Sequence, residues 1–108
     1  MKRAFSAITQ DALSVLGQQI RLARKARRLS ESALAERVGV ARSTLQRIER
    51  GDARVEIGLV FEACVIVGVP LFGDESRRLP HHAERLKAQL ALMPARIRQP
   101  TGPVDDEF

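Results

Sequence analysis

Five polar side chains lie close together within residues 41–50, and their types suit contact with a polyanion. They are Arg42, Ser43, Gln46, Arg47 and Arg50. An arginine can donate two parallel hydrogen bonds to a phosphate, or to the O6 and N7 atoms of guanine, while serine and glutamine add neutral hydrogen-bonding groups. If residues 41–50 form a helix with Leu45 and Ile48 turned inward, these five side chains make its outer face.

The distribution of charge points in the same direction. Residues 1–55 contain twelve Lys or Arg and five Asp or Glu, a net charge of +7, whereas residues 56–108 contain six and eight, a net charge of −2. A basic half suits nucleic acid, because each basic side chain at a phosphate releases condensed counterions. From charge alone, a solvated basic face without a partner is an equal alternative. With four Phe and no Trp or Tyr, single-stranded nucleic acid is a poor candidate.

Hydrophobic periodicity predicts a helix over residues 10–28 and two shorter ones, over residues 31–38 and 41–50. Ser30 can cap the second helix. Gly39 allows a tight turn between the second and third helices, because glycine adopts the left-handed backbone conformation readily. The small or apolar residues that a steep crossing of these two helices needs are Ala35, Gly39, Val40 and Leu45.

The second half of the chain predicts two further helices. Residues 57–67 are apolar on nearly every side, and although the β-branched run 65–67 locally favours a strand, their length favours a fourth helix. A helix that is apolar all round must be buried all round, so we expect it to meet a partner as well. Pro80 can open a fifth helix, whose apolar stripe is Leu79, Ala83, Leu86, Leu90 and Met93. This stripe either packs on the fourth helix of the same chain or forms a seam across a dimer.

Residues 16–51 resemble the XRE/Cro/lambda-repressor helix-turn-helix family. The resemblance is carried by Leu-Ala-Glu-Arg-Val-Gly-Val at 34–40, Ser-Thr-Leu at 43–45 and Ile-Glu-Arg-Gly at 48–51. It implies an all-α fold, with a five-helix lambda-repressor-like domain over residues 1–93 and an extended tail over residues 94–108. It also implies a protein that binds double-stranded operator DNA with its third helix in the major groove.

The resemblance further assigns roles to individual side chains. Arg42 and Ser43 occupy the positions that most often touch bases, and Arg47 follows about one turn later, so we expect a guanine in each half-site. The side chains expected at the DNA backbone are Lys25, Arg28, Thr44, Gln46 and Arg50. Arg24 and Glu49 match family positions that commonly form a structural ion pair.

Two positions depart from the pattern of that family. Glu31 stands where the family often has a glutamine. A carboxylate near DNA lowers affinity unless it accepts a hydrogen bond from a cytosine amino group or from an arginine. Ala41 stands where a capping serine or threonine is common, so the third helix is expected to lack a side-chain cap and one phosphate contact.

The remaining features favour neither catalysis nor a cofactor. His81 and His82 point to different faces of a helix, without further Cys or His nearby, and no triad or phosphate-binding glycine loop is evident. We therefore expect no enzyme activity, no cofactor and no metal. Cys64 lies in an apolar run and is expected to be a small core residue. Residues 9–11 interrupt a signal-peptide core and no apolar run approaches about 20 residues, so we expect a cytoplasmic, nucleoid-associated protein without a membrane span.

The second half also bears on the type of regulator. Residues 69–73, the fifth helix and the tail with its Val-Asp-Asp-Glu-Phe end look like HipB-like antitoxins, the partners of HipA-type kinase toxins. This looser resemblance implies a homodimer that represses its own operon and binds a kinase toxin. A stand-alone phage-type or controller repressor and a protein-binding adaptor are the alternatives. The residues expected to contact the second copy or the partner are Phe61, Val65, Leu86, Leu90 and Phe108.

Overall fold

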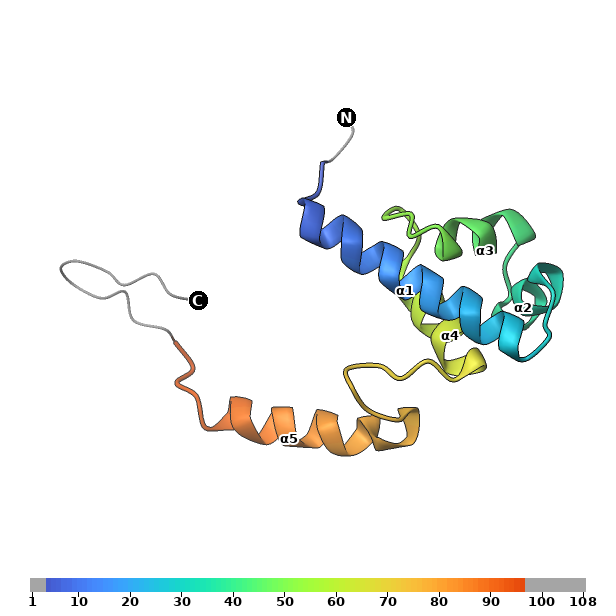
Figure 1. The fold of residues 1–108 in the computed structure, drawn as a ribbon. Helices are drawn as coiled ribbons and strands as arrows, with labels where there is room; N and C mark the ends of the chain where they lie inside the picture. The colour runs from blue at the N-terminus through green and yellow to red at the C-terminus, as the bar shows by residue number, and fades with distance from the viewer. Residues whose placement is uncertain (1–3, 97–108) are drawn as a thin grey trace. The chain divides into compact units, whose positions relative to one another are not determined.

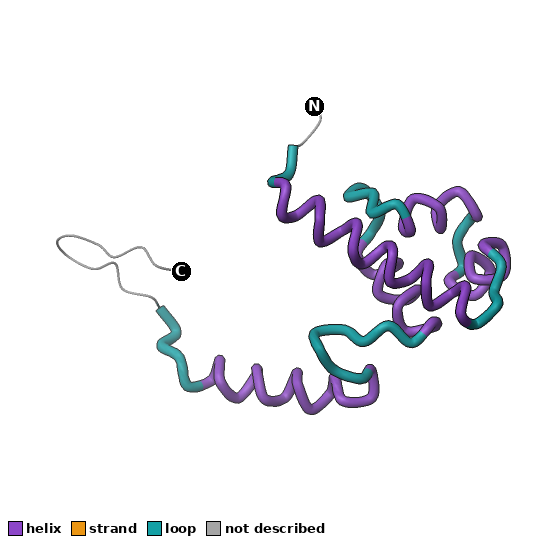
Figure 2. Tube along the Cα trace, in the orientation of Figure 1, coloured by secondary structure: helices purple, strands orange, loops and turns teal. Residues whose placement is uncertain are grey.

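The computed structural model describes residues 4–96, and this part of the chain is all-α (Figure 1). The helices are α1 (Ala7–Ala26), α2 (Glu31–Val38), α3 (Arg42–Glu49), α4 (Ile57–Val67) and α5 (Leu79–Ala91). A 3₁₀ turn at Ser76–Arg78 leads into α5, and within residues 4–96 no strand is drawn (Figure 2). The predicted all-α helix-turn-helix fold class is confirmed.

Capping residues explain where α1 and α2 begin and where α2 ends. Ser6 caps α1 by accepting a hydrogen bond from a backbone N–H three residues later, at 3.2 Å, so α1 begins earlier than residue 10. Ser30 caps α2 in the same way, at 3.0 Å. Gly39 ends α2 with a φ of 88°, in the left-handed region that glycine tolerates best. Ala41 precedes α3 without a side-chain cap.

The core lies among α1 to α4, because α1 and α2 each pack against both α3 and α4. The largest fully buried side chains are Ile20, Leu34, Leu45, Cys64 and Val67. Each of the four helices therefore contributes to one core, which holds α3 in place from its inner side. Burial also raises the pKa of the Cys64 thiol to about 11. The buried position agrees with the expectation that Cys64 is a small core residue.

The fourth helix is present despite its β-branched run, and within one chain it is buried on one side only, so the expectation that a partner covers its other side stays a prediction. Only Ala63, Cys64 and Val67 of α4 are buried. Ile57 is 68% exposed and Val65 is 46% exposed. Because α4 packs on α1 and α2 from one side, its other side, which includes Ile57 and Val65, stays exposed in the described part of the chain.

The chain divides into two compact units between Ser76 and Arg77. The first unit contains α1 to α4. The second contains α5, in which no residue is buried. The sequence predicts a domain over residues 1–93 followed by an extended tail, and this domain boundary stays a prediction. Of the expected tail over residues 94–108, residues 97–108 lie outside the described part of the chain.

Candidate nucleic-acid interface

The third helix separates its side chains into a buried and an outward face. The buried face consists of Leu45, Ile48 and Glu49. The outward face consists of the exposed Arg42, Ser43 and Arg50 and the half-buried Thr44, Gln46 and Arg47. All three side chains expected to touch bases, and three of those expected at the DNA backbone, thus share the outward face of one short helix.

The turn between α2 and α3 fixes how these two helices cross. The backbone N–H groups of Gly39 and Val40 both donate to the carbonyl of Ala35, each at 2.9 Å, and so reverse the chain tightly. Leu34 of α2 and Leu45 of α3 are fully buried, and the two helices pack on one another. α3 is therefore held by its neighbour as a rigid element, as a helix-turn-helix requires.

Arg24 of α1 and Glu49 of α3 form a bidentate ion pair inside the first unit. Arg24 donates from Nε to Oε2 of Glu49 at 2.7 Å and from Nη2 to Oε1 at 3.1 Å. The two side chains are only 7% and 5% exposed. Arg24 also donates from Nη1 to the carbonyl of Leu29 at 2.9 Å. The hydrogen bonds to Glu49 raise the pKa of Arg24 above its ordinary value, although burial opposes the shift.

Glycines allow α1 and α3 to approach closely, a feature that could not be predicted from the sequence pattern. A Cβ atom on Gly17 of α1 would lie 2.5 Å from the carbonyl oxygen of Glu49 and 2.8 Å from that of Ile48. At the end of α3, Gly51 has a φ of 76°, and a Cβ there would meet the backbone of Leu13 at 2.8 Å. The contact between α1 and α3 is therefore one of backbone on backbone, which only glycine permits.

Glu31, at the first turn of α2, binds two side chains of α3. Its Oε1 atom accepts a hydrogen bond from Nε of Arg42 at 3.0 Å and one from Nε2 of Gln46 at 3.2 Å. Nη2 of Arg42 lies 3.0 Å from the same oxygen. The hydrogen bond from Gln46 and then those from Arg42 hold the pKa of Glu31 below its ordinary value. The carboxylate that departs from the family pattern thus has an arginine as its partner.

Asp52, in the loop after α3, binds two further arginines. Its carboxylate accepts from Nε of Arg47 at 3.0 Å and from Nε and Nη2 of Arg54, each at 3.1 Å. It also accepts from the backbone N–H of Arg54 at 2.9 Å. These contacts, those of Arg54 first, hold the pKa of Asp52 well below its ordinary value. Asp52 and Arg54 were not singled out from the sequence, because only the loop conformation brings them to Arg47.

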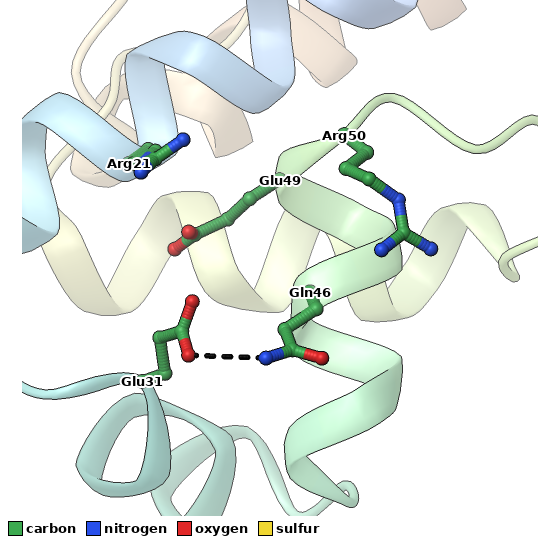
Figure 3. A pocket seen from close by; sticks show the side chains of 5 residues that line it. All are labelled: Arg21, Glu31, Gln46, Glu49 and Arg50. Carbon is green, nitrogen blue, oxygen red and sulfur yellow. Dashed lines mark hydrogen bonds between the residues drawn. The ribbon is translucent and has the colours of Figure 1, made fainter.

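A polar hollow of about 270 Å³ lies beside α3 and contains side chains from three helices (Figure 3). Its lining residues are Arg21, Glu31, Gln46, Glu49 and Arg50. Arg21 and Arg50 approach it from α1 and from the end of α3. Arg21 also lines a second hollow together with Lys25. Exposed basic side chains therefore extend from Lys25 through Arg21 toward Arg50, and Arg21 joins the candidates for contact with the DNA backbone.

The other predicted contact residues belong to other segments of the chain. Arg28, beyond the end of α1, is exposed and has a φ of 56°. In α4, Phe61 is half-buried and packs edge-to-face on Phe72, with ring centroids 5.9 Å apart, while Val65 is exposed. In α5, Leu86 and Leu90 are 50% and 71% exposed. Phe108 lies outside the described residues.

No group of three or more His, Cys, Asp or Glu within residues 4–96 is placed to hold a metal ion. Among the helices described here, none combines the length and the apolar character needed to cross a membrane.

A rigid pair of crossing helices, the second of which presents arginines outward, defines a helix-turn-helix domain, a class that inserts its second helix into the DNA major groove. The chain belongs to the helix-turn-helix domain family, which matches residues 15–79. The matched region contains the C-terminal part of α1, all of α2 to α4 and the linker to α5. The expected membership of a helix-turn-helix family is thereby confirmed.

A curated relative from Rhodospirillum rubrum is described as an uncharacterized transcriptional regulator in the ATPase CF(0) region. It is 33% identical to this chain over 70 residues, which are 62% of this chain and 65% of the relative. The chain thus spans slightly less than two thirds of that protein. No solved structure matches the chain significantly.

Proposed function

We propose that this protein is a sequence-specific DNA-binding transcription regulator that acts as a dimeric repressor. The observation that carries the proposal is that α3 is fixed to the protein by a buried ion pair on one side and exposes an arginine on the other. Glu49 of α3 is held by Arg24 inside the protein, while Arg42 on the same helix is 63% exposed. The family membership and the description of the relative as a transcriptional regulator support it.

In this proposal Arg42 and Ser43 touch base edges and Arg47 assists them. Arg42 would recognise a guanine through two parallel hydrogen bonds. Arg47 is 36% exposed, and Asp52 binds its Nε, so its terminal N–H groups remain for DNA. The contacts to the DNA backbone would come from Lys25, Arg28, Thr44, Gln46 and Arg50. A protein with this role acts on the nucleoid, in the cytoplasm.

A dimer fits the apolar surfaces that the described chain leaves exposed. On α4, Ile57, Phe61 and Val65 recur every four residues, so they share one side of the helix. Leu86 and Leu90 mark the apolar stripe of α5. We propose these two surfaces as the contacts with a second copy or a partner. A dimer would then place its two α3 helices at half-sites about 34–36 Å apart.

The finer role that we propose is that of an antitoxin for a HipA-type kinase toxin. It rests on the resemblance of residues 69–73, the fifth helix and the tail to HipB-like proteins. The alternative is a stand-alone phage-type or controller repressor. A kinase-like protein encoded beside this chain that co-elutes with it supports the antitoxin role. A chain truncated after Met93 that retains every function contradicts it.

Selection from a random library of duplex DNA tests the proposed function. The full chain should enrich a two-fold symmetric site with a guanine in each half, and should elute as a dimer on that site. Enrichment of no sequence, or equal affinity for the enriched and an unrelated duplex, contradicts the proposal. A chain that binds no duplex but retains a protein partner would instead be the adaptor.

A further inference from the structure

One carboxylate oxygen of α2 accepts hydrogen bonds from two side chains of α3. Oε1 of Glu31 accepts from Arg42 and from Gln46, at 3.0 and 3.2 Å. The Glu31 side chain is 27% exposed, whereas that of Arg42 is 63% exposed. A mostly covered carboxylate therefore holds an arginine that extends into solvent at the start of the proposed recognition helix.

We propose that Glu31 is a positioning residue that sets the base preference of Arg42 by occupying one edge of its guanidinium group. The inference rests on the proposed DNA-reading function and extends it to a residue of α2. Glu31 itself touches no base in this proposal. It acts through Arg42, and it lowers binding to DNA that lacks the matching guanine.

The geometry of the guanidinium group explains the selection of one edge. An arginine carries five N–H bonds in one plane, and it can present two parallel N–H groups either from the Nε and Nη2 edge or from the Nη1 and Nη2 edge. Glu31 faces both Nε and Nη2 of Arg42, so the first edge is occupied. The second edge keeps its two parallel N–H groups, which match the O6 and N7 acceptors of guanine.

Charge explains why the same contact disfavours other sequences. A free arginine binds any nearby phosphate and so strengthens binding to every duplex. The carboxylate of Glu31 compensates the charge of Arg42 and restrains its side chain, and both effects weaken contacts with phosphates. A correctly placed guanine still meets the available edge. The pair therefore lowers non-specific affinity more than specific affinity.

The surroundings keep Glu31 ionised and in place. It is the first residue of α2, directly after the Ser30 cap, where the helix dipole favours negative charge. Gln46 binds the same oxygen from the next turn of α3, so the carboxylate is tied to that helix at two points. In Glu31→Gln the side chain keeps nearly the same shape, loses its charge, and exchanges one accepting oxygen for a donating NH2 group.

The test compares full-length Glu31→Gln with Glu36→Gln, which removes an exposed carboxylate from the same helix. Dissociation constants are measured at equal salt for three duplexes: the selected site, the site with the Arg42-contacted guanine replaced, and an unrelated sequence. Glu31→Gln should bind the unrelated duplex several-fold more tightly and lose about tenfold of the preference for that guanine, within the range of one bidentate base contact. Glu36→Gln should change all three affinities by the same factor.

Two further outcomes separate this inference from the proposed function. In an Arg42→Ala background, Glu31→Gln should leave the base preference unchanged, because Glu31 acts only through Arg42. An unchanged guanine preference in the single variant Glu31→Gln overturns the inference alone. A wild-type chain that selects no sequence overturns the proposed function and this inference with it.

Discussion

Arg24 on α1 and Glu49 on α3 face one another through two hydrogen bonds of 2.7 and 3.1 Å, and both side chains are shielded from water. The pair lies on the inner side of α3. It therefore sets the rotation of α3 about its own axis, and with it the set of side chains that α3 turns outward. In the proposed function, the ion pair would affect DNA recognition by orienting α3 and would make no contact with DNA itself.

Replacement of Arg24 by alanine should lower the free energy of unfolding more than the same replacement of an exposed arginine. Arg24→Ala leaves the Glu49 carboxylate buried without its partner, which typically costs about 3–5 kcal/mol. Urea unfolding at pH 7 measures the effect. Arg21→Ala, which changes an exposed arginine on the same helix, is the matched control and should fall within about 0.5 kcal/mol of wild type. Equal stability of the two variants would contradict a structural role for Arg24.

Two glycine substitutions should have opposite effects. Gly17→Ala places a methyl group 2.5 Å from the backbone oxygen of Glu49, so α1 and α3 must separate, at a cost of at least about 1–3 kcal/mol. Gly58→Ala in α4 meets nothing within 4 Å and should stabilise the helix by about 0.5–1 kcal/mol. Thermal unfolding of the two variants compares them directly. A Gly17→Ala protein as stable as wild type would refute the backbone contact of α1 with α3.

The lowered pKa of Asp52, in the loop after α3, predicts that the stability of the fold depends on pH. Its pKa is lower in the folded protein than in the unfolded chain, because it accepts hydrogen bonds from Arg54 and Arg47. Its stabilising effect is therefore complete above the unfolded pKa of about 3.9 and is lost as the pH falls through the folded value. Asp52→Asn should unfold at lower urea concentration than wild type at pH 7.

The difference between Asp52→Asn and wild type should shrink as the pH is lowered below about 4. Urea midpoints between pH 7 and pH 2 follow the difference. Arg54→Ala removes the partner with the largest effect on Asp52, and so should show part of the same loss at pH 7. A difference that stays constant over this range would show that the carboxylate has no such partners in solution.

The parts of the site that could be predicted from sequence are those encoded by short, local patterns. The cap at Ser30, the left-handed turn at Gly39 and the helical spacing of apolar residues in α3 each depend only on residues close together in the sequence. They were sufficient to place the two crossing helices and the outward position of Arg42.

The parts that could not be predicted depend on contacts between distant segments. The need for glycine at Gly17 arises only when α1 meets the backbone of α3. The pairing of Asp52 with Arg47 and Arg54 depends on the path of a loop. Which side of α4 packs inside the domain could not be predicted either, because an apolar composition does not reveal which side finds a neighbour; Val65 stays exposed.

The measurement that tests the central claim most directly is the affinity of Arg42→Ala for the selected duplex and for its single-base variants, beside that of Lys25→Ala. Arg42→Ala should lose about 1–3 kcal/mol on the selected site and relax the preference at one base pair. Lys25→Ala should weaken binding to all duplexes alike and reduce the salt slope by about 1. An Arg42→Ala protein that binds the selected duplex as tightly as wild type, at the same salt concentration, would contradict the assignment of α3 as the reading helix.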